Sequence, residues 1–445
     1  MAHHELKRVL TLWDGIALAI GSIAGSGILY LPSLTYVLAG HNVLLVWLGG
    51  TLLCLPLLFM FADMVRFIAD GSGIEGFIAR GLGTHVAATV PLLFLSIVIL
   101  GIPAGVMIAG KYLEAAIGGG MAVQFVGALV ILVIALLSNL GGASVGARVQ
   151  QLMSFVLITI VIVLCAFTFP HIRHGYSAVI PELSAPGPIL SGIVVAFWAY
   201  AGFENLTFIA GEFRNPRRDF PLAMISAFLA YGTLAVALTI IIAALIPEAQ
   251  VSAFSGLLQL AQSIAPAWLA ISIIVIFALA IMQMNAASWI WGMSRLIYAS
   301  AQARRLPRWF AHLDSRDLPR RAILLLGVLF VAITGLAVIF PDLLVTILTI
   351  ASSVFIFLYV LCLVAYLRLT RSIGKRLLYG AFLLFLLVTL ASVGLKIIYP
   401  IVVFLLALLA SLVRERYQRS PAIARASSSL KESRRETLSP PMETP

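Results

Sequence analysis

The sequence predicts an all-α polytopic membrane protein with twelve transmembrane helices, and three observations lead to this prediction. Hydrophobic residues make up 62% of the 445 residues and charged residues only 11%, whereas a soluble protein carries about 25% charged residues. The apolar residues fall in runs of about 20 residues or more, the length that spans a bilayer. The basic residues fall between these runs, mostly on one side of the predicted membrane.

The twelve apolar runs define the predicted spans in order. They cover residues 12–39, 43–66, 87–112, 121–140, 149–170, 188–211, 222–246, 267–299, 322–340, 343–367, 376–393 and 397–413. Residues 1–11 precede them as a short N-terminus, in which Lys7 and Arg8 mimic the start of a signal peptide. Because the first run continues to about Ala39, we interpret it as a retained helix.

The distribution of basic residues predicts the orientation. Only three of the 29 Lys and Arg residues, Lys111, Arg173 and Lys396, fall on the side opposite the N-terminus. Basic loops stay in the cytoplasm, so we expect both termini inside and the protein in the inner membrane of a bacterium. This topology explains the net charge of +11 without nucleic acid. Residues 420–445, rich in Ser, Pro, Arg and Glu, are expected to be disordered.

The first and sixth spans contain residues that interrupt helices. Residues 21–27 read Gly-Ser-Ile-Ala-Gly-Ser-Gly, and each glycine weakens a helix by about 1 kcal/mol. Close helix packing is the alternative explanation. The sixth span favours interruption, because Gly202 and Glu204 lie in an apolar run. A carboxylate at that depth costs several kcal/mol unless it is paired, hydrated or protonated, so it is a candidate functional group.

These two spans hold corresponding positions in two sets of five, residues 12–170 and 188–367. An odd number of spans inverts the second set, and matched interrupted helices in inverted repeats mark the substrate site of transporters. A helix break offers N–H groups to an anion and carbonyls to a cation. For a small zwitterion, the predicted site residues are Ile23, Gly25, Ser26, Gly27, Trp198, Ala201, Gly202 and Phe203, with the carboxylate at Gly25 to Gly27.

Three motifs resemble the amino acid–polyamine–organocation superfamily of transporters. They are Gly25-Ser26-Gly27-Ile28 with Leu31-Pro32, Gly202-Phe203-Glu204 with residues 212–221, and the stretch from Asn285 to Pro307. The resemblance covers about residues 6–413 and implies a LeuT-type fold of five spans inverted against five. Residues 376–413 are then peripheral spans 11 and 12. Residues 100–104 further resemble exporters of methionine and branched-chain amino acids.

The resemblance also implies roles for individual residues. Glu204 is similar to the family's carboxylate beside the substrate, and Trp198 to its aromatic gate. The lysine that serves as a proton site in some relatives is missing from span five, so we predict proton coupling through Glu204. Two alternatives stay open. Ser288 and first-span carbonyls could bind sodium, or Glu204 could simply hydrogen-bond the span-one amides.

The predicted substrate is a neutral apolar amino acid, because no second carboxylate lies near Glu204 in the sequence. Candidates for its side-chain pocket are Met107, Phe197, Trp289 and Ser353. The predicted activity is export, with import or exchange of other substrates, including cationic or aromatic ones, as alternatives.

No cofactor or metal site is predicted, since the three cysteines lie in apolar runs and all seven histidines in tails or loops. An intramembrane enzyme would need facing catalytic groups and a channel a continuous polar pore, so both are disfavoured.

Overall fold

The computed structural model describes residues 8–67, 73–171, 186–253, 255–340, 343–392 and 394–418. These residues form helices, and the one β contact among them is a parallel bridge between Leu10 and Phe213. The predicted tail of residues 420–445 and the side chain of Trp198 lie outside the described part. The α-helices are α1 (Leu12–Ile23), α2 (Gly27–Ala39), α3 (Val43–Phe67), α4 (Gly73–Leu82), α5 (Thr84–Ala87), α6 (Val90–Ile117), α7 (Gly120–Leu140), α8 (Ala143–Thr168), α9 (Pro186–Ala199), α10 (Pro216–Leu245), α11 (Gly256–Ile264), α12 (Ala267–Gln302), α13 (Arg320–Ile339), α14 (Leu343–Leu369), α15 (Ile373–Ser392) and α16 (Ile398–Gln418).

Ten helical runs in the described residues are long and apolar enough to cross a membrane. Two shorter apolar helices, Leu12–Ile23 and Gly187–Phe197, lie where the sequence predicts the first halves of interrupted spans. Large apolar side chains such as Phe155 and Val328 are exposed, as lipid-facing residues are. The prediction of a multi-pass membrane protein is therefore confirmed, while the count of twelve stays a prediction. One long run, Gly27–Met64, combines the second half of the predicted first span with most of the second.

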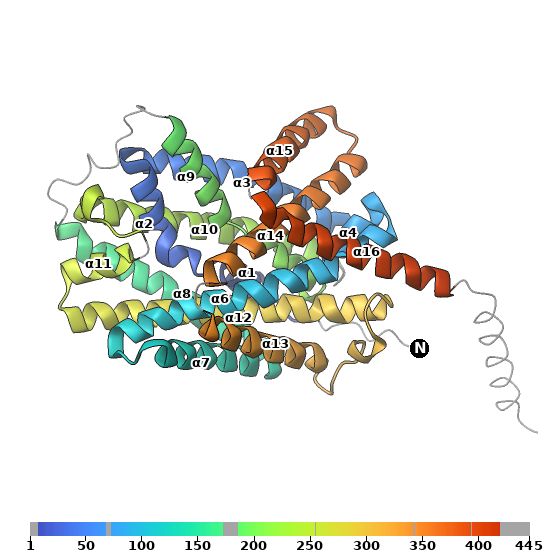
Figure 1. Cartoon of the computed structure of the whole chain (residues 1–445), viewed down its shortest axis with the longest axis horizontal. Helices are drawn as coiled ribbons and strands as arrows, with labels where there is room; N and C mark the ends of the chain where they lie inside the picture. Colours follow the sequence, from blue (N-terminus) through green and yellow to red (C-terminus); the bar gives the residue numbers. More distant parts are fainter. Residues whose placement is uncertain are drawn as a thin grey trace, which may run out of the picture.

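The helices pack in two groups, with α1 and the 3₁₀ helix after α9 between them. In one group α6, α7, α12 and α13 contact one another, and in the other α10 and α3 contact α2 and α9 (Figure 1). Helix α1 packs on α10 of the second group and on α12 of the first. The segment after α9, the 3₁₀ helix η4 (Phe203–Glu212), also contacts α1 and α12. The two breaks therefore lie at the boundary between the groups.

Three elements differ from the predicted spans. The second half of the sixth span is the 3₁₀ helix η4 rather than an α-helix, because the chain must approach the backbone of α1 there. Helices α4 and α11 form in segments that were expected to connect spans. Both are short and amphipathic, so a search for long apolar runs does not find them.

Candidate functional site

The first break separates α1 from α2 over three residues. Ala24 has a ψ of 87°, outside the helical range, and the Gly25 amide turns back to the Ile23 carbonyl at 2.9 Å. Ser26 caps α2 without a side-chain hydrogen bond. Among the described residues, the amides of Ser26 and Gly27 have no acceptor. Free N–H groups at the start of a helix form an anion site.

The second break lies against the first. Helix α9 ends at Ala199, and Gly202 then has a φ of +127°, a conformation that side chains other than glycine's rarely adopt. A Cβ on Gly202 would also collide with the carbonyl of Ser22. Glycine is thus required twice at this position, for its backbone angle and for the close approach of two backbones. Both predicted interruptions are present.

The carbonyls at the end of α1 accept hydrogen bonds from side chains of α12. Asn285 Nδ2 donates to the carbonyls of Gly21 and Ser22 at 2.9 and 3.1 Å. The indole nitrogen of Trp289 donates to the same Ser22 carbonyl at 3.2 Å. Neutral N–H groups therefore occupy carbonyls that a bound cation would otherwise use.

Ser288 lies in the same group of polar atoms. Its hydroxyl donates to the Leu18 carbonyl at 2.8 Å and is 2.5 Å from the hydroxyl of Ser22. Asn205 Nδ2 donates to the Ser22 hydroxyl at 3.0 Å and to the Ser288 carbonyl at 2.9 Å. The candidate sodium ligand is thus hydrogen-bonded to protein atoms, and the bonds join both broken helices to α12.

A cavity of about 940 Å³ lies against the first break. Of the predicted site residues, those in its wall are Ile23, Gly25, Ser26, Gly27, Phe197, Ala201 and Trp289. Lys111 is the one charged residue among the described residues that line it. The wall therefore combines free amides with a mainly apolar surface and contains no carboxylate.

Other predicted residues lie behind this wall. Met107 is buried and does not reach the cavity. The Ser353 hydroxyl donates to the Ile350 carbonyl at 2.7 Å, so it completes a hydrogen bond within α14. The ring of Phe203 packs edge-on against Phe61, with centroids 5.6 Å apart.

Helix α6 shapes the apolar side of the cavity with two glycines that the pocket prediction did not include. A Cβ on Gly101 would have no heavy atom within 4 Å. A Cβ on Gly105 would lie 2.5 Å from the Met282 methyl and 3.9 Å from the Ser26 hydroxyl. The missing side chain of Gly101 leaves a groove along α6, whereas the Met282 methyl fills the space beside Gly105.

Glu204 is completely buried and does not line the cavity. Its Oε2 atom accepts hydrogen bonds from the Gly202 amide at 3.0 Å and the Tyr359 hydroxyl at 2.9 Å. The Oε1 atom has no partner among the described residues. The carboxyl therefore bonds its own break and α14, and among the described residues it makes no hydrogen bond to the span-one amides.

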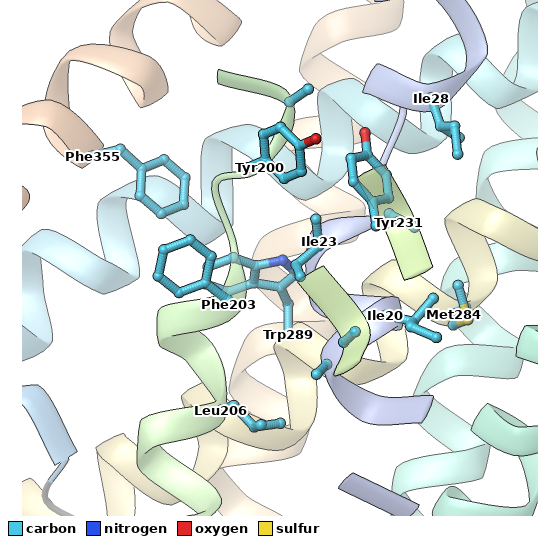
Figure 2. Close-up of a cluster of buried hydrophobic side chains, with 14 of the residues drawn as sticks. Ile20, Ile23, Ile28, Tyr200, Phe203, Leu206, Tyr231, Met284, Trp289 and Phe355 are labelled. Atoms are coloured by element: carbon cyan, nitrogen blue, oxygen red, sulfur yellow. The ribbon is translucent and has the colours of Figure 1, made fainter. Parts of the chain in front are cut away.

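Aromatic contacts connect Glu204 to the cavity wall. Tyr359 packs on Phe355 at 6.1 Å, and Phe355 packs on Trp289 at 5.7 Å between ring centroids. Figure 2 shows Trp289 and Phe355 together with Phe203 and Ile23, which come from four different elements. Tyr359 was missed from the sequence, although a tyrosine in the middle of an apolar span was a usable signal.

A buried ion pair joins α12 to the end of η4. Arg295 of α12 and Glu212 at the end of η4 are 2.6 Å apart, and the Trp291 indole donates to the same carboxylate at 3.1 Å. The Leu10 amide donates to the Glu212 carbonyl at 2.9 Å. This end of the molecule carries the segment before α1, whereas Lys111 at the other end of α6 lines the cavity. The cavity is therefore accessible from the side opposite the N-terminal segment.

Comparisons with known proteins find a matching family and several relatives described as amino acid exporters or permeases. A family model described as "Amino acid permease" matches residues 10–419. The L-methionine/branched-chain amino acid exporter YjeH of Escherichia coli (strain K12) is 28% identical over 418 residues, covering 89% of this chain and 94% of the relative. The uncharacterized amino acid permease YecA of Bacillus subtilis (strain 168) is 25% identical over 406 residues, with the same coverage. The branched-chain amino acid permease BcaP of Bacillus subtilis (strain 168) is 24% identical over 323 residues, covering 68% and 69%.

Proposed function

The chain belongs to the amino acid permease family, as its three motifs predicted, and from this premise we propose that it is a secondary transporter of neutral apolar amino acids. The observation that carries the proposal is the cavity wall, which joins free amides to an apolar groove without a carboxylate. In this proposal the amides of Ser26 and Gly27 bind the substrate carboxylate. The carbonyls of Ile23 and of Trp198 to Ala201 bind its ammonium group.

The groove along α6 supports methionine, leucine, isoleucine and valine as substrates. Gly101 provides room beside Ile102, and the apolar Met282 side chain fills the space beside Gly105. A cationic substrate side chain would lose its hydration there without gaining a carboxylate partner from the described wall, which costs several kcal/mol. The similarity to an exporter of methionine and branched-chain amino acids and to a branched-chain amino acid permease supports the same substrate class.

Coupling to protons through Glu204 is part of the proposal. Because Oε2 accepts both hydrogen bonds and Oε1 has no described partner, a proton can bind at Oε1 without breaking either bond. Sodium is the weaker alternative, since the carbonyls of Gly21 and Ser22 already accept N–H donors from Asn285. A cation would have to share these carbonyls with the N–H donors.

The proposed cycle is alternating access in the LeuT-type fold of twelve spans, with both termini in the cytoplasm of a bacterium. In that orientation the described conformation opens away from the cytoplasm. Closure on that side and opening beside Arg295 and Glu212 would then load substrate from within. Export is proposed as the direction, supported by the similarity to the exporter.

Counterflow in proteoliposomes tests the proposal. Purified protein is reconstituted with unlabelled leucine inside, and uptake of labelled leucine is measured against a panel of competing amino acids. Methionine, leucine, isoleucine and valine should compete, while arginine, lysine and glutamate should not. Strong competition by arginine would instead indicate a transporter of cationic amino acids.

Gly27→Leu tests the carboxylate position in the same assay. A Cβ at Gly27 would meet only the end of the flexible Leu31 side chain, at 2.9 Å, so the fold should tolerate it while counterflow is lost. Gly335→Leu is the matched control, because its Cβ has no heavy atom within 4 Å and lies in α13, away from the cavity. Normal counterflow by Gly27→Leu would refute the assignment.

A further inference from the structure

A second hollow, of about 590 Å³, lies beside the segment that precedes α1. Its described wall consists of Arg8, Arg214, Asn215, Pro216, Arg217 and Arg218. Every charged group in this wall is a guanidinium, which keeps its positive charge at all physiological pH values. This hollow is separate from the cavity at the first break, since the two share no lining residue.

The four guanidinium groups lack carboxylate partners within the described part of the chain. No ion pair joins any of them to Asp or Glu there. Glu212 is engaged by Arg295, and Asp219 is buried in the first turn of α10 and does not line the hollow. Like charges gathered around one hollow repel one another, so an anion between them would lower the electrostatic energy.

The backbone adds to this positive field. The hollow lies at the N-terminus of α10, a helix of 30 residues whose N-cap, Asn215, makes no side-chain capping bond. The amides of Arg218 and Asp219 turn back to the Asn215 carbonyl, and that of Arg217 has no acceptor among the described residues. Arginine forks match the paired oxygens of a phosphate group better than those of a monatomic ion.

The position of the hollow fits the headgroup layer of a membrane. Leu222, only one turn into α10 beyond Arg218, is exposed, and so is Leu229 two turns further on. One helical turn rises about 5.4 Å, so the arginines lie just outside the apolar surface that faces lipid. Clusters of basic residues at this depth attract anionic phospholipids.

We propose that this hollow binds a phosphate group, carried by an anionic phospholipid headgroup or by a soluble phosphate. Arg8 belongs to the segment before α1, and the other three arginines follow η4. These segments are joined by the bonds from the Leu10 amide to the Glu212 carbonyl and from the Arg214 amide to the Leu10 carbonyl, both 2.9 Å. A phosphate between them would stabilise the closed end of the described conformation.

The test titrates ligands into the purified full chain in detergent and measures its thermal unfolding temperature at each ligand concentration. Soluble dioctanoyl phosphatidylglycerol, dioctanoyl phosphatidylcholine and inorganic phosphate are compared at equal ionic strength. We expect a saturable rise with phosphatidylglycerol and none with the zwitterionic phosphatidylcholine. A rise with inorganic phosphate at similar concentrations would identify a soluble phosphate as the ligand.

Substitutions of arginine test whether the rise in unfolding temperature comes from binding in this hollow. Arg217→Gln/Arg218→Gln should weaken apparent binding about 30-fold, the loss expected for two arginines near an anionic ligand. Arg8→Gln, on the other segment, should weaken it as well. The control Arg316→Gln/Arg320→Gln removes two exposed charges outside the hollow and should leave binding unchanged. No stabilisation of the wild type by either ligand, or equal weakening by both double variants, would overturn the proposal.

Discussion

One added methyl group at Gly101 should reduce the room for the substrate side chain without disturbing the fold. A Cβ at this position has no protein atom within 4 Å, and Gly101 lies inside α6. Alanine favours a helix over glycine by about 1 kcal/mol, so the thermal unfolding temperature of Gly101→Ala should be unchanged or slightly higher. Any loss of transport then reports on the substrate rather than on the protein.

The expected loss follows from the size of the change. One carbon more or less in an apolar pocket changes substrate discrimination by about 1–3 kcal/mol, which is about 10- to 200-fold. The groove is open at one end, so we expect the lower limit, about tenfold weaker half-saturation for leucine and methionine in counterflow. Valine, whose side chain is shorter, should lose less.

Two further variants serve as comparisons for Gly101→Ala. Gly335→Ala adds the same methyl group to an equally open position in α13, away from the cavity. It should leave affinity unchanged, and its unfolding temperature, like that of Gly101→Ala, should be unchanged or slightly higher. Gly105→Ala would meet the Met282 methyl at 2.5 Å, and because this methyl ends a flexible side chain that can shift, the unfolding temperature should change little. Unchanged leucine and methionine affinities in a stable Gly101→Ala would refute the placement of the side chain along α6.

Three other predictions concern the polar groups around the breaks. Glu204→Gln should still exchange substrate but no longer respond to a pH gradient in proteoliposomes. A variant that concentrates substrate with a pH gradient alone would contradict the proton role. Gly202→Ala should lower the unfolding temperature in detergent, because φ is +127° and the methyl group meets the Ser22 carbonyl. An unchanged temperature would argue against the close approach of the breaks. Glu212→Gln leaves Arg295 buried and unpaired, at a cost of about 3–5 kcal/mol, so stability should fall and should partly recover in Glu212→Gln/Arg295→Met. Absence of any recovery would mean that the unpaired charge is not the cause.

The breaks could be predicted from the sequence because their cause is local. Glycines at 21, 25 and 27 and the pair Gly202 and Glu204 stand out against apolar runs that otherwise favour helix. The N–H groups that follow a break belong to the backbone, so their position needs no knowledge of side-chain packing. The 3₁₀ form of η4 depends on the approach of α1, which is a tertiary contact that the sequence does not contain.

The side-chain pocket could be predicted only in part. Phe197 and Trp289 line the cavity, but Met107 does not, although it lies on the same helix as Gly101. Spans buried on all sides are apolar around their whole circumference, so periodicity does not reveal which face meets the cavity. Choosing large apolar residues also overlooks glycines, and here Gly101 creates open space.

The location of Glu204 indicates how a proton could influence the substrate without touching it. A hydrogen bond to an ionised carboxylate is about twice as strong as one to a neutral group, so protonation weakens the bonds from the Gly202 amide and the Tyr359 hydroxyl together. Ala201, beside Gly202, lines the cavity, and so does Phe355, one turn before Tyr359 on α14. In the proposed cycle, loss of the charge therefore loosens the second break and α14 at the same time. In the same proposal, substrate contacts both elements and competes for the geometry that the carboxylate maintains, and this competition couples the two fluxes.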